Sequence, residues 1–485
     1  MPTRLVSSLL VLTPLLLASC AQRAGFPERP NILLVTIDTL RADHLSSYGY
    51  VRPTSPVIDR LAAEGVRFDQ AAVQWPKTGP SFASIFTATY PKDNGIVRKI
   101  GIPVPLEYRT LAEELRGLGY TTHAVVANGA AGSDFNFDQG FDTYIETWKL
   151  PPTDKLPDPN RADGVTALAL ALTGRIDRDK PFFLWVHYLD PHFPYTPPEP
   201  WSDMFQDDEH YQPLRELEVD PKAKKRDLVG IGYGQVLDGR TDLGFYVARY
   251  DAEIAFNDHH LGELLAGLER DGWLDNTLTV LTSDHGESLG EHYYMFDHGR
   301  FSFQTCLRVP LIFHFPGVLS PAVVKEPVEL IGLAPTLLEA AGLPLEEGRW
   351  AQGRSLAAEL LRPEAPDRPR RPYAFSEAGY GVDGRWQRIV RTERYKLVEA
   401  REGGAQRWVT GEPGKPYALF DLESDPGETE NLYDRLPDEA ERLKAVLERW
   451  KAAGFDPRRD DPSQVEEREM DPETRRQLKA LGYLQ

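Results

Sequence analysis

The chain has 485 residues, with 55 basic and 74 acidic side chains and a formal net charge of −19. This excess of negative charge disfavours a protein that binds nucleic acid or another polyanion. The length allows about three domains, and a hydrophobic content of 41% is enough for a large core, which argues against a disordered chain.

The first twenty residues have the pattern of an export signal. Arg4 precedes an apolar stretch over residues 5–18, which is followed by Ser19 and Cys20. Small residues before this cysteine resemble a bacterial lipobox, so we expect residues 1–19 to be a lipoprotein signal peptide and Cys20 to be lipidated. An ordinary signal peptide with a chance cysteine is the alternative. Residues 20–28 would then form a tether, and the exported lipoprotein would face the periplasm or the cell surface.

Apolar runs alternate with helical patterns along the body of the chain. Runs predicted as buried, parallel strands are Ile32–Ile37, Thr121–Ala127, Phe182–Tyr188, Leu278–Thr282 and Pro310–Phe315, and amphipathic segments include Leu111–Leu118 and Ala255–Leu268. This alternation predicts a doubly wound α/β fold. Ligands of such sheets bind beyond the carboxyl ends of the strands, so the polar residues that end each run are the candidate site residues.

Residues that commonly bind metal ions follow two of the predicted strands. Asp38 ends the first run, and Asp284 and His285 follow the run that ends at Thr282. A carboxylate next to an imidazole is a typical pair of metal ligands. Taken alone, an aspartate at a strand end is more often a helix N-cap than a metal ligand, and this alternative applies to both Asp38 and Asp284.

Thr78 is the candidate nucleophile. It opens a helical pattern that has Pro80 in its first turn. The backbone N–H groups and the positive dipole end of a helix stabilise an oxyanion, and they help a hydroxyl to carry alkoxide charge. A plain threonine cap is the alternative.

From residue 29 to residue 450 the chain resembles the sulfatase branch of the alkaline phosphatase superfamily. The matching stretches are Arg29-Pro30-Asn31-Ile32, Asp38-Thr39-Leu40-Arg41-Ala42-Asp43, Thr78-Gly79-Pro80-Ser81, His187-Tyr188-Leu189-Asp190-Pro191-His192, Ser283-Asp284-His285-Gly286-Glu287, Asp297-His298-Gly299, Arg308-Val309-Pro310-Leu311, Ala334-Pro335-Thr336-Leu337-Leu338, Arg394-Tyr395-Lys396-Leu397 and Phe420-Asp421-Leu422-Glu423-Ser424-Asp425-Pro426-Gly427-Glu428. The resemblance implies a large mixed, mostly parallel sheet sandwiched by helices, with a small C-terminal antiparallel sheet plus a helix. We expect a catalytic domain over 29–360, a C-terminal subdomain over 370–452, and a charged tail with a docking helix over 453–485.

The chain departs from the sulfatase pattern at the nucleophile. Sulfatases carry Cys or Ser, oxidised to formylglycine, in a Cys/Ser-x-Pro-x-Arg core, whereas this chain has Thr78 and Phe82 in the outer positions. Thr39 replaces the second residue of the usual Asp-Asp pair, and Asn128 lies in a stretch where a Lys and a His are usual. These departures resemble phosphodiesterases and phospho-group transferases of the superfamily, which use an unmodified threonine.

By this resemblance, one divalent metal ion is held by Asp38, Thr78, Asp284 and His285. The imidazole nitrogen of His285 favours Zn²⁺ or Mn²⁺ over Ca²⁺. His192 and His298 match positions that contact the transferred group in relatives, although similar histidines hold a second ion in two-metal members. An ordinary loop or core histidine is the alternative for each.

The resulting hypothesis is hydrolysis of a sulfate or phosphate ester, with phosphoester or phosphodiester cleavage favoured. The metal lowers the pKa of the Thr78 hydroxyl, the alkoxide attacks phosphorus in line, and a covalent phospho-Thr78 intermediate forms. His192 or His298 stabilises the equatorial oxygens or protonates the leaving oxygen. The alternatives are an arylsulfatase-like sulfuric ester hydrolase, a phospho-group transferase and a catalytically inactive binding protein.

Other polar residues receive structural interpretations. Asp258, His259 and His260 lie on a helical pattern and are predicted to form a solvated face. The charged stretch 458–476 is predicted to be exposed, and the leucines and the tyrosine of residues 478–484 are predicted to dock on the protein.

Overall fold

The computed structural model describes residues 25–97, 101–151, 157–206, 216–345, 352–368, 370–379, 386–400, 409–411, 414–453 and 470–484. The predicted signal peptide, Cys20 and the charged residues 454–469 lie outside the described residues. Within the described ranges, no helix combines the length and the apolar character needed to cross a bilayer.

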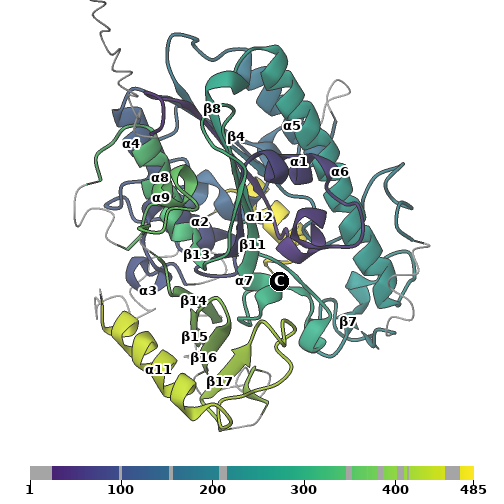
Figure 1. The fold of residues 1–485 in the computed structure, drawn as a ribbon. Helices are drawn as coiled ribbons and strands as arrows, with labels where there is room; N and C mark the ends of the chain where they lie inside the picture. The colour runs from purple at the N-terminus through teal and green to yellow at the C-terminus, as the bar shows by residue number, and fades with distance from the viewer. Residues whose placement is uncertain are drawn as a thin grey trace, which may run out of the picture.

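A central sheet organises the larger part of the molecule (Figure 1). In the described part of the chain, nine strands run in the order β12-β2-β11-β8-β1-β5-β3-β4, with β13 paired to β2. Their bounds are β1 (Asn31–Ile37), β2 (Val66–Ala72), β3 (Thr121–Val126), β4 (Thr143–Glu146), β5 (Phe182–Tyr188), β8 (Thr277–Thr282), β11 (Arg308–His314), β12 (Ala322–Val324) and β13 (Val328–Glu329). The predicted mixed, mostly parallel sheet is confirmed.

One strand direction differs from the prediction. The run Pro310–Phe315 was expected to be parallel, but it forms β11, which pairs antiparallel with both β2 and β8. Its interior residues are as buried as those of the parallel strand β8. Burial on both faces sets the apolar composition of a strand, and it is the same for either direction.

Helices cover both faces of the sheet. The helices are α1 (Pro56–Glu64), α2 (Thr78–Thr87), α3 (Pro91–Asn94), α4 (Leu111–Gly117), α5 (Ala162–Thr173), α6 (Leu243–Arg270), α7 (Gln304–Leu307), α8 (Leu333–Ala340), α9 (Ala357–Leu361), α11 (Pro437–Ala452) and α12 (Pro472–Ala480). Ile32 and Leu34 of β1 pack with α2, α4 and α8, whereas Leu33 and Val35 pack with α1, α5 and α6. This alternation of successive strand residues places a core on each side of the sheet.

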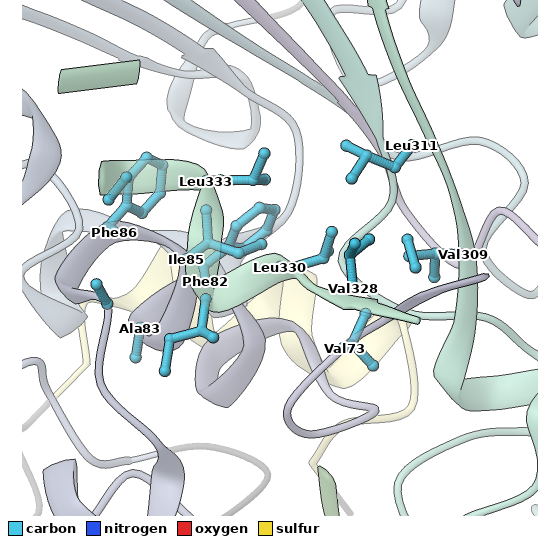
Figure 2. Packing of buried hydrophobic residues seen from close by; sticks show 14 of the residues in the cluster. Val73, Phe82, Ala83, Ile85, Phe86, Val309, Leu311, Val328, Leu330 and Leu333 are labelled. Atoms are coloured by element: carbon cyan, nitrogen blue, oxygen red, sulfur yellow. The ribbon is translucent and has the colours of Figure 1, made fainter. Parts of the chain in front are cut away.

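Helix α2 is fixed by its apolar side. Figure 2 shows Phe82, Ile85 and Phe86 of α2 lying with Leu330 and Leu333 in one buried cluster. All ten residues of α2 are buried. The start of this helix is therefore held rigidly against the sheet.

A small antiparallel sheet follows, as predicted. It contains β14 (Ala374–Gly379), β15 (Trp386–Arg391), β16 (Tyr395–Ala400) and β17 (Tyr417–Asp421), with α11 against it. Two short pairs, β6 (Val219–Asp220) with β7 (Ile231–Gly232) and β9 (Ser288–Leu289) with β10 (Met295–Asp297), complete the strands. The N–H of Gly379 donates to the carbonyl of Gly299 at 2.7 Å, which joins the small sheet to the loop after β10.

The predicted solvated face on α6 is wrong for two of its three residues. Asp258 and His260 are buried, and only His259 is exposed. The reason is that α6 packs against α1 and α5 at once, so more than one of its faces is covered. Asp258 accepts hydrogen bonds from the backbone N–H groups of Val57 (2.9 Å) and Ile58 (2.8 Å) in the first turn of α1.

The last helix returns to the larger domain. In Figure 1, α12 (yellow) lies among the elements of the central sheet, whereas α11 lies with the small sheet. Leu478 and Tyr483 are buried and belong to the same hydrophobic cluster as Phe82 and Leu333.

Candidate active site

Two adjacent strands bring the predicted acidic residues together. β1 and β8 are parallel neighbours, so Asp38 after β1 and Asp284 after β8 meet at one edge of the sheet. Asp284 Oδ2 lies 3.3 Å and Asp38 Oδ1 lies 3.8 Å from Nε2 of His285. All three side chains are fully buried.

Burial makes the negative charge on these carboxyl groups unfavourable. It raises the pKa of Asp38 to about 7, although a hydrogen bond from Asn128 and the charge of Lys77 act in the opposite direction. Burial and the charge of Asp38 raise the pKa of Asp284 well above its ordinary value. Burial likewise lowers the pKa of His285 well below its ordinary value, so this imidazole is neutral. A cation between these groups would relieve the cost of burying both charges.

The unsatisfied atoms of this cluster fit such a cation. Asp38 Oδ1 and Asp284 Oδ2 are buried without a hydrogen-bond partner, and they are the carboxylate oxygens that face His285 Nε2. Two carboxylate oxygens and a neutral imidazole nitrogen are a suitable donor set for a divalent transition metal.

His187, which was not predicted as a ligand, is a second candidate nitrogen donor. Its Nε2 lies 3.6 Å from Asp38 Oδ2, and its Nδ1 lies 2.9 Å from the hydroxyl of Thr36. Asp38, His187 and Asp284 form one of the residue groups with metal-binding geometry. The Asp38 oxygen that faces His187 already accepts a hydrogen bond from Asn128 at 2.5 Å, whereas the oxygen that faces His285 accepts none. His285 is therefore the better placed of the two imidazoles.

Thr78 lies directly beside this cluster. It is the first residue of α2, as expected, and its Oγ1 lies 3.3 Å from His285 Nε2. Nδ1 of His285 lies 2.9 Å from the carbonyl oxygen of Gly286, which can only accept, so Nδ1 carries the ring proton. Nε2 then carries the lone pair and accepts from the Thr78 hydroxyl.

The two other predicted histidines lie next to the cluster. The rings of His298 and His285 are 4.1 Å apart, and those of His298 and His192 are 5.3 Å apart, measured between centroids. Nδ1 of His298 lies 3.1 Å from Oε1 of Glu287, and Nδ1 of His192 lies 2.7 Å from the carbonyl oxygen of Phe193. The structure thus gathers every predicted site residue in one place.

Several neighbours of Thr78 were missed by the sequence interpretation. Lys77 is buried and its Nζ lies 3.3 Å from Asp297 Oδ1, so a positive charge sits beside the nucleophile. Burial lowers the pKa of Lys77, while the charge of Asp297 raises it. Tyr483 places its hydroxyl 3.1 Å from Thr78 Oγ1. Of the two missed residues, only Lys77 could have been found from the sequence motif, because it directly precedes Thr78.

The three departures from the sulfatase pattern other than Thr78 have distinct places in the structure. Phe82 points into the core, where its ring contacts Trp185 and His187 at centroid distances of 4.9 Å. Its side chain has no polar group that could contact the carboxylates. Thr39 has a φ of 55°, which is strained for a β-branched residue, and its N–H donates to Asp284 Oδ1 at 3.3 Å. Asn128 follows β3 and donates to Asp38 at 2.5 Å.

Comparisons with known proteins identify relatives of this chain. The family profile described as Sulfatase matches residues 30–343, and the profile described as N-sulphoglucosamine sulphohydrolase, C-terminal, matches residues 290–452. The arylsulfatase of Clostridium perfringens is 26% identical over 454 residues, covering 83% of this chain and 90% of that protein. The choline-sulfatase of Rhizobium meliloti is 27% identical over 479 residues, covering 88% of each chain.

Solved structures share the fold. The structure of BT4656 in complex with its substrate D-glucosamine-2-N,6-O-disulfate superposes with a TM-score of 0.72 at 23% identity, covering 90% of this chain and all of the other. The phosphonate monoester hydrolase of Agrobacterium radiobacter gives a TM-score of 0.67 at 23% identity, covering 88% of this chain and 96% of the other. Because the Sulfatase profile spans well over half of the sequence, this chain belongs to the sulfatase family of ester hydrolases.

Proposed function

We propose that this protein is a metal-dependent hydrolase of phosphate esters or diesters that uses unmodified Thr78 as its nucleophile. The observation that supports this most directly is the position of the Thr78 hydroxyl. It lies at the start of α2 and 3.3 Å from His285 Nε2, beside two buried carboxylates. A threonine hydroxyl in this place has the positive end of the helix dipole to favour its alkoxide form.

Asp38, Asp284, His285 and Thr78 are the proposed metal ligands. A bound divalent ion would supply positive charge that lowers the pKa of the Thr78 hydroxyl and offsets charge on the transferred group. We favour Zn²⁺ or Mn²⁺ over Ca²⁺, because an imidazole nitrogen completes the donor set.

The side chains around Thr78 provide the proton transfers and bind the transferred group. Thr78 Oγ1 forms a bond to phosphorus as the bond from phosphorus to the leaving oxygen breaks, and the leaving oxygen takes a proton from Nε2 of His298. Glu287, at Nδ1 of His298, stabilises the charged ring before that transfer. Water then attacks phosphorus and gives one proton to His298 while the bond from phosphorus to Thr78 Oγ1 breaks, which returns Thr78 to the alkoxide form that made the first attack. Lys77 and His192 are placed to bind the non-bridging oxygens.

A sulfuric ester hydrolase is the second candidate. The relatives named arylsulfatase and choline-sulfatase favour it, and the same attack by Thr78 on sulfur would serve. A transferase differs only in the acceptor, an alcohol in place of water. An inactive binding protein is the least favoured alternative, because usable side chains fill every proposed metal and nucleophile position.

The test compares aryl sulfate, aryl phosphate, aryl phosphodiester and aryl phosphonate monoester as substrates of the mature protein loaded with Zn²⁺, Mn²⁺ or Ca²⁺. Thr78→Ala is the inactive variant, and Thr78→Ser is the matched control that retains a hydroxyl. We expect a phosphorus ester to be hydrolysed best, Thr78→Ala to be inactive, and Thr78→Ser to keep measurable turnover. Hydrolysis of the sulfate alone would support the second candidate, and unchanged turnover by Thr78→Ala would exclude both.

We also propose that the protein is exported and anchored through a lipid on Cys20, with its active site facing the periplasm or the cell surface. The proposal rests on the apolar stretch that ends at Ala18-Ser19-Cys20. Expression of the full chain in bacteria tests it. The wild-type protein should fractionate with membranes and incorporate labelled palmitate, whereas Cys20→Ser should do neither, and labelling of both proteins or of neither would contradict the proposal.

A further inference from the structure

The end of the chain is built to reach the active site. Asp471 caps α12 by accepting from the N–H groups of Glu473 (2.9 Å) and Thr474 (3.2 Å), and Pro472 takes the first helical position. Gly482, with a φ of 73°, ends the segment in the left-handed conformation that glycine adopts without strain. The N–H of Tyr483 then donates to the carbonyl of Leu478 at 2.8 Å, so the chain turns back after α12. The side chain of Tyr483 points toward Thr78 at the start of α2.

Helix α12 is attached beside the carboxyl end of β3. Gln477 donates to the carbonyl of Ala127 at 2.8 Å and accepts from the N–H of Gly129 at 2.6 Å. Trp148 Nε1 donates to the hydroxyl of Thr474 at 3.1 Å. These contacts flank Asn128, so the helix is placed by the same loop that holds Asp38.

Tyr483 is in direct contact with the proposed catalytic groups. Its hydroxyl lies 3.1 Å from Thr78 Oγ1 and 3.2 Å from Asn128 Nδ2. Its ring stacks on His192 at a centroid distance of 5.3 Å with an interplanar angle of 27°, and Nζ of Lys77 lies 5.9 Å from the ring centroid. The whole residue is buried, with an exposed fraction of 7%.

The direction of these hydrogen bonds follows from the donors. Asn128 Nδ2 can only donate, so it donates to the phenolic oxygen of Tyr483. Under the proposed function Thr78 reacts as its alkoxide, and an alkoxide oxygen can only accept hydrogen bonds. The phenolic proton of Tyr483 is therefore directed at Thr78 Oγ1. The phenol of Tyr483 is therefore a neutral donor next to the nucleophilic oxygen. Once Thr78 has attacked the ester, oxygens of the transferred group lie near this donor.

We propose that Tyr483 is a catalytic residue, and that its phenol donates a hydrogen bond to a non-bridging oxygen of the group transferred to Thr78. This inference rests on the proposed function. Thr78 is only 1% exposed beneath Tyr483, so the terminal segment shifts when an ester enters, and the phenolic proton passes from Thr78 Oγ1 to the ester oxygen as its acceptor. In the structure the stack on His192 holds the Tyr483 hydroxyl beside Thr78 before the ester enters.

The test uses Tyr483→Phe, which removes the hydroxyl and keeps the ring that packs on His192. The control is Tyr233→Phe, because Tyr233 is exposed at the surface and is not among the proposed site residues. With the best substrate found for the wild-type protein, we expect Tyr483→Phe to lower kcat roughly 10- to 100-fold with KM nearly unchanged, as expected for loss of a donor that acts in the transition state. The control should keep wild-type kcat.

Inhibition by vanadate and by inorganic phosphate gives a readout that does not depend on the fraction of folded enzyme. Vanadate imitates the transition state, so Tyr483→Phe should weaken vanadate inhibition about tenfold more than phosphate inhibition. Equal weakening of both, or a wild-type kcat, would overturn the proposal.

Removal of residues 471–485 separates a catalytic tyrosine from a segment that merely covers the site. We expect the shortened protein to lose at least as much kcat as Tyr483→Phe. A higher kcat/KM in either variant would overturn the proposal and identify the segment as an inhibitory cover. Thr78→Ala is assayed in parallel: if it retains turnover, the proposed function fails, whereas an inactive Thr78→Ala with a fully active Tyr483→Phe rejects the role of Tyr483 alone.

Discussion

Oε1 of Glu287 lies 3.1 Å from Nδ1 of His298, and both side chains are buried. Burial and the charge of Asp297 raise the pKa of Glu287 well above its ordinary value. A positive charge on the His298 ring therefore stabilises Glu287 as a carboxylate, the carboxylate stabilises the charged ring in return, and the proton on Nε2 is available for transfer. His192 differs, because its Nδ1 lies 2.7 Å from the carbonyl oxygen of Phe193, which carries no charge. Of the two histidines, His298 is therefore the better general acid.

This difference predicts a dependence on the leaving group. Because an alkyl alcohol needs protonation to leave and 4-nitrophenol does not, His298→Ala should reduce kcat/KM for an alkyl ester about 100-fold more than for the 4-nitrophenyl ester. Glu287→Gln should show the same trend more weakly. Steady-state kinetics with a series of leaving groups measure the effect, and His192→Ala is the matched control. An equal loss for all esters in His298→Ala would contradict the assignment.

Metal binding should depend on His285 more than on His187. The two carboxylate oxygens that lack hydrogen-bond partners face His285, so His285→Ala should weaken binding of Zn²⁺ or Mn²⁺ at least about tenfold. His187→Ala should weaken it less. Titration of the metal-free protein by calorimetry checks this, and chelation should also lower the Tm of the wild-type protein. A larger effect of His187→Ala would assign the nitrogen ligand to His187.

Gly299 should be required for the position of Lys77. A Cβ at Gly299 would lie 2.1 Å from Cε of Lys77, and φ at Gly299 is 90°. Gly299→Ala should therefore displace Lys77, which adjoins Thr78, and reduce kcat by about tenfold or more. Gly272→Ala is the control, because Gly272 has a similar φ of 72° and no neighbouring atom within 4 Å. If both variants lose the same activity, backbone strain and not the Lys77 contact is responsible.

The buried carboxyl group of Asp258 predicts a pH dependence of stability. Burial raises its pKa from 3.8 to about 7, although the hydrogen bonds from Val57 and Ile58 lower it. Since the folded protein binds this proton more tightly than the unfolded chain, the associated stability is complete below about pH 4 and is lost as the pH rises through 7.

Asp258→Asn removes the titration and keeps one acceptor for α1. The Tm of the variant minus the Tm of wild type should therefore be larger at pH 8 than at pH 5. Thermal unfolding of both proteins at the two pH values measures this difference. A difference in Tm that is the same at pH 5 and pH 8 would show that Asp258 does not titrate in this range.

Much of the fold could be predicted because apolar runs and their polar ends are local features. The runs ending at Ile37 and Thr282 became neighbouring strands, which brought Asp38 and Asp284 together. Strand direction was not readable, since β11 is buried on both sides whichever way it runs. The environment of Asp258 was missed because the packing of α6 against both α1 and α5 involves residues far apart in sequence.

The site was predictable where chemistry resides in a motif and not where it comes from a distant contact. Thr78 and His298 were found from their motifs, but Tyr483 lies 405 residues after Thr78 and its own segment predicts only docking. The role of Glu287 depends on its distance from His298, which the spacing of the two residues along the chain does not give.

The most direct test of the account is rapid quenching of the metal-loaded enzyme during turnover of an aryl phosphodiester, followed by mass spectrometry of the peptide that contains residue 78. The account predicts a phosphoryl adduct on Thr78 in the wild-type protein and none in Thr78→Ala, which should also be inactive. Turnover by wild type with no adduct on Thr78, together with full activity of Thr78→Ala, would contradict it.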